Sequence, residues 1–246
     1  IEVTGDNLLS QASVFGDWGD VIAMPNIAVA AAQLPDGEIV TWSSWDRFDF
    51  GGNNPRTYTS VFNTKTQEVE EFLITETQHD MFCPGTVMLP DGRILVNGGG
   101  SVVKSTSVYD FRTDTWSRVD DMQMRRWYNT SATLADGRVL TWGGNAPDGH
   151  AGDMEVYEDG VGWTSIANSN INIYAGSGDK TSWHPQIFQA PNGRVFVAGP
   201  GENMYWADLD DASGGDVLEF AGKRGTDGYS QHGAYVMYDV GKILKF

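Results

Sequence analysis

The sequence predicts an all-β fold, a kelch-type β-propeller with four-stranded blades of about fifty residues each. Three observations predict it: a repeated hairpin phrase, the spacing of that phrase, and a composition rich in glycine and aromatic residues. The 246 residues include 30 glycines and 9 tryptophans, which suits short strands joined by tight turns. No stretch has the periodicity of a long amphipathic helix.

The repeated phrase is an apolar strand, a turn containing Asp-Gly or Asn-Gly, and a second apolar strand. Its copies are Leu34–Trp42, Leu89–Asn97, Leu134–Trp142 and Ala190–Ala198, with a shortened copy at Val240–Phe246. Asp-Gly and Asn-Gly between apolar runs favour hairpins, because glycine readily takes the positive φ that the tight turn requires. Each copy therefore predicts a pair of antiparallel strands.

The spacing of the turn glycines gives the repeat length. They are Gly37, Gly92, Gly137, Gly193 and Gly241, at intervals of 55, 45, 56 and 48 residues. This period is typical of kelch blades. A Gly-Gly pair after the second strand and aromatic residues in the outer strands complete the pattern, at Gly98–Gly99, Gly143–Gly144, Tyr109, Trp116, Tyr157 and Trp163.

The fifth copy of the repeat is cut before its Gly-Gly turn. Propellers commonly close a ring of four to eight blades. We therefore expect residues 1–246 to form a single propeller domain, truncated before its C-terminal blades, with about five of seven blades present. The alternative, a five-bladed ring that ends here, would leave a strand edge unpaired.

Charge and composition exclude several kinds of partner. The net charge is −17, whereas nucleic acids and anionic membranes are bound through basic patches. No apolar run reaches the length of about 18 residues that a membrane helix needs. One cysteine cannot form an internal disulfide. We expect a monomer without nucleic-acid or membrane partners.

Aligning the repeats on their turn glycines predicts a functional site. The residue nine places before each glycine is Ala28, Cys83, Tyr128, His184 or His232. We expect these residues to open the innermost strand of each blade and to lie at one height around the axial channel. Thiol, phenol and imidazole groups suit copper, and such a channel mouth is a common place for a site. Taken singly, each residue could instead be a packing or wall residue.

Two segments around this ring resemble the copper-radical oxidases, the family that includes galactose oxidase and glyoxal oxidase. His79–Gly85 resembles the family segment with the cross-linking cysteine, and Arg125–Ala132 resembles the segment with the cross-linked tyrosine. Further similarity spans nearly the whole chain, at Trp18–Ala32, Trp42–Ser44, Asp49–Gly52, Met122–Met124 and Val236–Asp239.

The resemblance implies a definite chemistry. The sulfur of Cys83 would be bonded to the ring of Tyr128, and the modified Tyr128 would bind copper and carry a radical. A primary alcohol, an aldehyde or a carbohydrate would lose two electrons, and O2 would leave as hydrogen peroxide. The resemblance also implies a secreted protein.

Other positions follow the family pattern less closely. Phe50 matches a pocket-lining phenylalanine, Lys180 aligns loosely with a sugar-contacting arginine, and His184 and His232 would line the channel near the site. No segment of the chain matches those that supply the family's other copper ligands, so we expect this chain alone to be inactive. The segment Gly143–His150 also lacks the tryptophan that stacks over the thioether in galactose oxidase.

Two other functions remain open from the sequence. The first is a kelch propeller that binds a glycan or protein partner without catalysis. The second is a zinc or copper site made of Cys83, His184 and His232 without radical chemistry.

Overall fold

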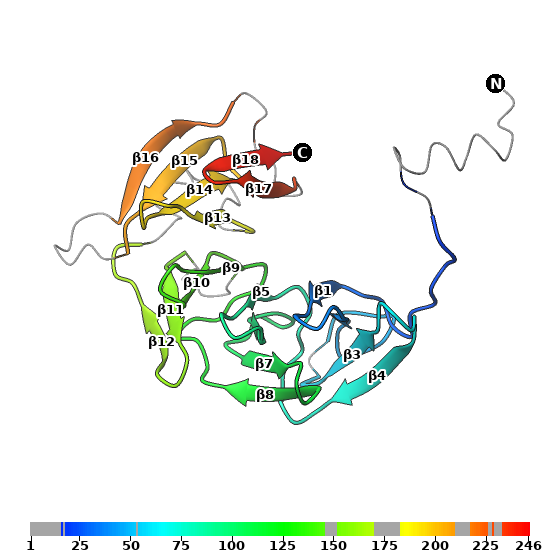
Figure 1. The fold of residues 1–246 in the computed structure, drawn as a ribbon. Helices are drawn as coiled ribbons and strands as arrows, with labels where there is room; N and C mark the ends of the chain where they lie inside the picture. The colour runs from blue at the N-terminus through cyan, green and yellow to red at the C-terminus, as the bar shows by residue number, and fades with distance from the viewer. Residues whose placement is uncertain are drawn as a thin grey trace, which may run out of the picture.

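The computed structural model describes residues 16, 18–52, 54–145, 152–169, 183–209, 217–225, 228 and 233–246. These residues form antiparallel β-sheets that follow one another along an arc (Figure 1). No α-helix occurs within the described ranges.

Each of the first four sheets is a meander of four strands in sequence order. The first contains β1 (Ala30–Gln33), β2 (Ile39–Trp42), β3 (Thr57–Phe62) and β4 (Val69–Ile74). The second contains β5 (Gly85–Met88), β6 (Ile94–Asn97), β7 (Thr106–Asp110) and β8 (Thr115–Val119). The third contains β9 (Thr130–Thr133), β10 (Val139–Trp142), β11 (Glu155–Glu158) and β12 (Gly162–Ser165). The fourth contains β13 (Gln186–Gln189), β14 (Val195–Gly199), β15 (Asn203–Ala207) and β16 (Leu218–Lys223).

The predicted hairpins join the first two strands of each sheet. Gly37, Gly92 and Gly137 take φ values of 94°, 90° and 90° at these turns. In the turn before β6 the Asp91 carboxylate accepts a hydrogen bond of 3.1 Å from the amide of Arg93. Aspartate therefore closes the turn while glycine supplies its positive φ.

The first strand of each sheet lies nearest the centre of the arc, as the repeat predicts. β5 packs beside β9, and β9 packs beside β13, which places the inner strands of successive blades next to one another (Figure 1). Their leading ends therefore converge from neighbouring blades toward one region.

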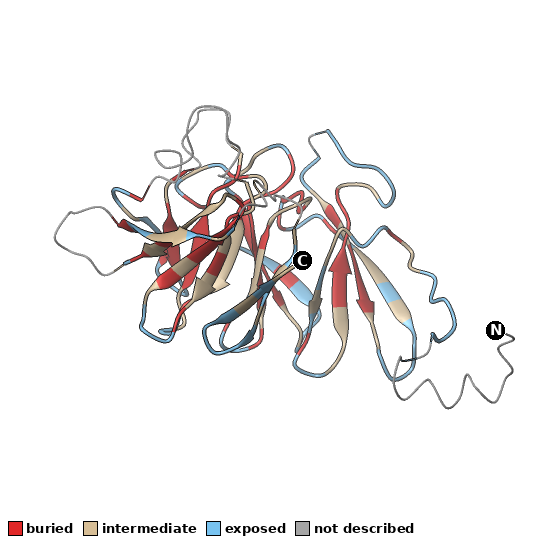
Figure 2. Cartoon of the chain, turned by 90° about the horizontal axis from the view of Figure 1, so that it is seen from above, coloured by how far each residue is buried: buried red, intermediate tan, exposed pale blue. Residues whose placement is uncertain are grey.

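Apolar side chains between neighbouring sheets form the core. Trp42 and Trp142 are both fully buried, and each belongs to a cluster with residues of the adjoining sheet. Figure 2 shows buried positions concentrated on the strands and exposed ones on the connecting loops. Burial of each large apolar side chain stabilises the fold by about 1.5–3 kcal/mol. The prediction of a kelch-type propeller is confirmed.

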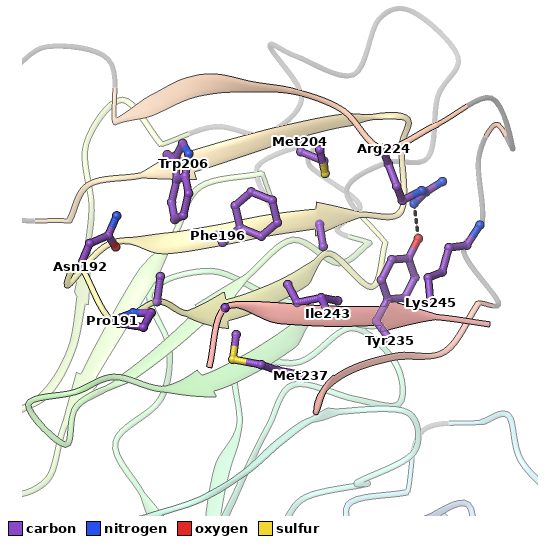
Figure 3. Close-up of a pocket in the computed structure, with 13 residues that line it drawn as sticks. Pro191, Asn192, Phe196, Met204, Trp206, Arg224, Tyr235, Met237, Ile243 and Lys245 are labelled. Carbon is purple, nitrogen blue, oxygen red and sulfur yellow. Dashed lines mark hydrogen bonds between the residues drawn. The ribbon is translucent and has the colours of Figure 1, made fainter. Parts of the chain in front are cut away.

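A fifth sheet follows with two described strands, β17 (Tyr235–Asp239) and β18 (Lys242–Lys245). Between it and the fourth sheet lies an apolar cavity of about 480 Å³ (Figure 3). Phe196 and Trp206 line it from the fourth sheet, and Met237 and Ile243 line it from the fifth. The total number of blades stays a prediction.

Candidate active site

Cys83, Tyr128 and His184 occupy matching places in three successive blades. Each lies two residues before the inner strand of its blade, rather than opening the strand as expected. All three have a left-handed backbone, with φ values of 53°, 64° and 48°. This region is unfavourable for non-glycine residues and persists only where surrounding contacts impose it.

Backbone hydrogen bonds between blades impose part of this conformation. The amide of Tyr128 donates to the carbonyl of Cys83 at 3.3 Å, and the amide of His184 donates to the carbonyl of Tyr128 at 2.9 Å. The three residues are thus linked in series across three blades. The structure brings together three of the five positions that the repeat alignment picked out.

The side chains of Cys83 and Tyr128 lie close enough to shift each other's pKa. Burial raises the pKa of the Cys83 thiol to about 11, and the interaction with Tyr128 opposes this shift. Burial also raises the pKa of the Tyr128 phenol, and Cys83 adds to that increase. Both groups therefore hold their protons near neutral pH, with the sulfur beside the phenol.

Three further rings contact Tyr128. The ring of Trp127 stacks on it with centroids 4.4 Å apart and planes inclined by 16°. The rings of Trp183 and His184 each lie 5.2 Å away, inclined by 32° and 57°. Neither tryptophan was among the site residues predicted from the sequence. They immediately precede Tyr128 and His184, so the repeat alignment shifted by one residue would have found them.

Phe50 connects to this group through one intervening ring. Its side chain stacks on Phe82 at 5.0 Å, and Phe82 lies 6.3 Å from Trp127. Phe50 is 65% exposed, so core packing does not explain its position. His232 and Lys180 lie outside the described residues.

A fully buried ion pair supports the segment that leads to Tyr128. Arg126 donates to the Glu155 carboxylate at 2.9 Å, and both side chains have no exposed surface. Arg126 also donates to the carbonyl of Gly143 at 2.8 Å. The other oxygen of Glu155 accepts from the amide of Gln123 at 2.5 Å. The pair therefore joins the approach to Tyr128 to strands β10 and β11.

His79 supports the segment that leads to Cys83, as Arg126 supports the segment that leads to Tyr128. Its Nε2 donates to the carbonyl of Gly98 at 2.7 Å, and its Nδ1 accepts from the hydroxyl of Ser107 at 2.9 Å. Gly98 follows β6 as Gly143 follows β10. Ser107 and Glu155 take equivalent places in the pairing of β6 with β7 and of β10 with β11. Burial lowers the pKa of His79 to about 4, so the ring is neutral at physiological pH.

A buried carboxyl group lies on the same turn as Cys83. Asp80 is 6% exposed, and no described residue forms a hydrogen bond with its Oδ1. Burial raises its pKa to about 6, and the nearby backbone of Phe82 and Trp45 opposes this shift. Its charge contributes to the raised pKa of Cys83.

The donor groups fit copper in kind but do not make a complete coordination sphere. A phenol and an imidazole are suitable ligands, and Tyr128 and His184 place one of each side by side. Among the described residues, no group of three or more His, Cys, Asp or Glu side chains could hold a metal ion. His232, the third ligand of the alternative site expected from Cys83, His184 and His232, lies outside the described residues.

Sequence comparison relates this arrangement to known enzymes. Two galactose oxidase sequences from Gibberella zeae are each 39% identical over 246 residues, covering 94% of this chain and 35% of the relative. The chain is a homologue of the galactose oxidases. This similarity confirms the resemblance to the copper-radical oxidases. The chain spans about a third of the length of these relatives.

Structural comparison agrees. A fungal alcohol oxidase of the AA5 family, solved in complex with copper, superposes with a TM-score of 0.81 at 35% identity, covering 91% of this chain and 47% of that one. An F-box/kelch-repeat protein of Arabidopsis thaliana is 35% identical over 127 residues, which are 48% of this chain and 31% of the relative. No protein-family model matches the chain. Within the described ranges, no helix is long and apolar enough to span a membrane.

Proposed function

We propose that this chain is the propeller part of a copper-radical oxidase that oxidises a primary alcohol or an aldehyde and reduces O2 to hydrogen peroxide. One observation carries the proposal. In a homologue of galactose oxidase, a main-chain hydrogen bond joins Cys83 and Tyr128 from neighbouring blades, and their side chains lie close enough to shift each other's pKa.

The first step is the formation of a thioether between these residues. A bond forms between the Cys83 sulfur and a ring carbon next to the Tyr128 hydroxyl, while one S–H and one C–H bond break. Two electrons and two protons leave and convert O2 to hydrogen peroxide. Because a main-chain hydrogen bond joins the two residues, little ordering would be needed before the bond forms.

Tyr128 is the copper ligand that the described residues supply, and the remaining ligands would come from outside them. Bound copper would supply one-electron exchange with O2 and with the substrate. The cross-linked Tyr128 would store the second oxidising equivalent in its ring and take a hydrogen atom from the substrate carbon. Phe50, His184, His232 and Lys180 would line the approach of the substrate.

The complete protein would extend beyond this segment. The coverage of its relatives supports further blades that complete the ring and supply the missing ligands. The family resemblance supports an extracellular protein that acts on small alcohols, aldehydes or carbohydrates, and the net charge of −17 fits a monomer.

Peptide mapping of the complete natural polypeptide tests the proposal. The reduced, copper-free protein is exposed to Cu²⁺ and O2, digested, and analysed by mass spectrometry. We expect the Cys83 and Tyr128 peptides to run as one species lacking two hydrogen atoms, and Tyr128→Phe to abolish that species. Separate peptides with a free Cys83 thiol in the wild type would rule out the cofactor.

A second candidate is a propeller that binds a glycan or protein without catalysis. The similarity to an F-box/kelch-repeat protein is a similarity to a protein that is not named as an oxidase. This candidate requires Cys83 to remain a free thiol in the same peptide map. It also requires binding of the partner, measured by glycan array or affinity capture, to be unaffected by Cys83→Ala.

A further inference from the structure

The apolar cavity beside the fifth sheet lies between two sheets of different width. The fourth sheet has four strands, and the described part of the fifth has two, β17 and β18. Phe196 of β14 and Trp206 of β15 line the cavity from the wider sheet, and Met237 and Ile243 line it from the narrower one (Figure 3). Within the described residues, the fifth sheet has no strand beyond β18 to match β15 and β16.

The equivalent position is covered in each earlier blade. The second and third strands of a blade place an apolar cross-strand pair on the face toward the next blade, and the side chains of these pairs are at most 8% exposed. The equivalent pair in the fourth blade is Phe196 and Trp206, and both are only half-buried. The earlier pairs are Val40 with Val61, Leu95 with Val108, and Leu140 with Val156.

The outer strands of the following blade provide this cover. Each earlier pair shares a core cluster with one tyrosine from the third strand and one large apolar residue from the fourth strand of the next blade. The tyrosines are Tyr109, Tyr157 and Tyr205, and the residues of the fourth strand are Trp116, Trp163 and Leu218. The first two strands of a blade are therefore not enough to close the interface.

The edge of β18 beside the cavity offers a place for another strand to pair. The amide of Phe246 donates to the carbonyl of Ala234 at 2.9 Å, and Leu244 lies opposite Val236 in the same ladder. Residues of an antiparallel pair alternate between hydrogen-bonded and non-hydrogen-bonded positions. The backbone groups of Leu244 therefore point toward β17, and those of Ile243 point toward the other edge.

A second copy of the chain does not fit this edge. Two β18 strands paired antiparallel would be related by a two-fold axis perpendicular to the joined sheet, which keeps the same face of both sheets on one side. The wider fourth sheets of the two copies would then both lie on that side. Their strands β15 and β16, which extend beyond β18, would occupy the same space.

We propose that the cavity is the docking site of a β-hairpin that forms the third and fourth strands of the fifth blade. In the three preceding blades these strands end at Val119, Ser165 and Lys223, within about 30 residues of the turn glycine. The hairpin would thus be the segment of about 25 residues that follows Phe246 in the complete polypeptide. It would pair with β18 by strand addition and place a large apolar or aromatic side chain against Phe196 and Trp206.

The relatives leave room for such a segment. The chain covers 35% of its galactose oxidase relatives and 47% of the solved alcohol oxidase. This inference concerns the scaffold and does not depend on the copper chemistry. A protein that docks the hairpin but never forms the thioether would keep this inference and lose the proposed function.

Hydrogen exchange of the wild-type complete polypeptide, resolved at single amides, tests the strand pairing. The amide of Leu244, which points toward β17, is the internal control. We expect the amide of Ile243 to exchange within about tenfold of the Leu244 rate, because both belong to one cooperative sheet. Exchange of Ile243 more than about 100-fold faster than that of Leu244 would show an unpaired edge and overturn the proposal.

Photo-cross-linking identifies the occupant. The photoreactive residue p-benzoylphenylalanine replaces Trp206 in the complete polypeptide, which is irradiated, digested and analysed by mass spectrometry. We expect a cross-link within the same chain to the segment of about 25 residues after Phe246. A cross-link to a second copy, or none to the polypeptide, would overturn the proposal.

Phe220 is the matched control position. It lies in the same sheet as Trp206, opposite Tyr205 in the ladder of β15 and β16, and Tyr205 belongs to the cluster that faces the third blade. Phe220 is 58% exposed on that other face. We expect p-benzoylphenylalanine at position 220 to give no cross-link to the segment after Phe246. Equal cross-linking from both positions would show a segment without a fixed place and overturn the proposal.

Discussion

The amide of Tyr128 donates a hydrogen bond to the carbonyl of Cys83 at 3.3 Å, so these two residues are joined through the main chain. Their proximity therefore does not depend on the thiol or the phenol. Substitutions that remove either group should change the chemistry and leave the blades in place.

The reactivity of Cys83 should depend on pH in the copper-free protein. Burial raises the thiol pKa from 9.0 to about 11, and the thiolate is the reactive form. We expect alkylation by iodoacetamide to be slow at pH 8 and to accelerate until the pH passes about 11, in contrast to a small-molecule thiol. Mass spectrometry of timed samples measures the rate. A rate that levels off near pH 9 would contradict this prediction.

His79 should make the protein less stable in weak acid. Its pKa is lowered to about 4 in the fold, compared with about 6.5 when unfolded. The unfolded state therefore gains a proton first, and stability is lost as the pH falls from about 6.5 to about 4. We expect His79→Gln to reduce this loss, because glutamine can still donate to Gly98 but does not titrate. Urea unfolding at pH 7 and pH 4.5 gives the comparison.

Breaking the buried ion pair of Arg126 and Glu155 should lower the unfolding free energy of the protein. Glu155→Leu leaves the Arg126 guanidinium buried without its carboxylate, which typically costs about 3–5 kcal/mol of unfolding free energy. The exposed pair of Lys242 and Asp239 is the control, and Lys242→Ala should cost less than about 1 kcal/mol. Equal costs in a denaturant titration would show that the buried pair does not anchor this segment.

Gly85 should not tolerate a side chain. A Cβ atom there would lie 2.5 Å from the Ser131 hydroxyl and 2.8 Å from the Asn97 side-chain oxygen. These two groups share a hydrogen bond of 2.6 Å between the second and third blades. We expect Gly85→Ala to separate the blades that carry Cys83 and Tyr128 and to slow thioether formation. Gly37→Ala is the control for the removal of a glycine, because it has a positive φ but open space around it.

The fold followed from local sequence rules. An Asp-Gly turn needs only its own few residues, so the hairpins and the blade period could be predicted from the phrase around Gly92 and its copies. The alignment also placed Cys83, Tyr128 and His184 on neighbouring blades. Their left-handed backbone could not be predicted, because it arises from hydrogen bonds between blades.

The supporting residues were harder to predict. Arg126 and Glu155 are 29 residues apart, and nothing in either segment indicates that the two meet. The contact between Tyr128 and Trp183 depends on side-chain rotamers and on the approach of two blades. Its one sequence signal, an aromatic residue before each matched position, is clear only once the packing is known.

The blade-to-blade hydrogen bonds through Cys83, Tyr128 and His184 use only main-chain atoms. Tyr128 and His184 supply the amide donors, which any amino acid except proline would keep, although the left-handed backbone disfavours β-branched residues. Gene duplication of such a blade would therefore place equivalent positions around one axis. A substitution at one of them could change the side chain and keep the main-chain hydrogen bonds. A cysteine at one of these positions and a tyrosine at the next could then arise by two independent point mutations. Their reaction with each other would require no further change in the fold.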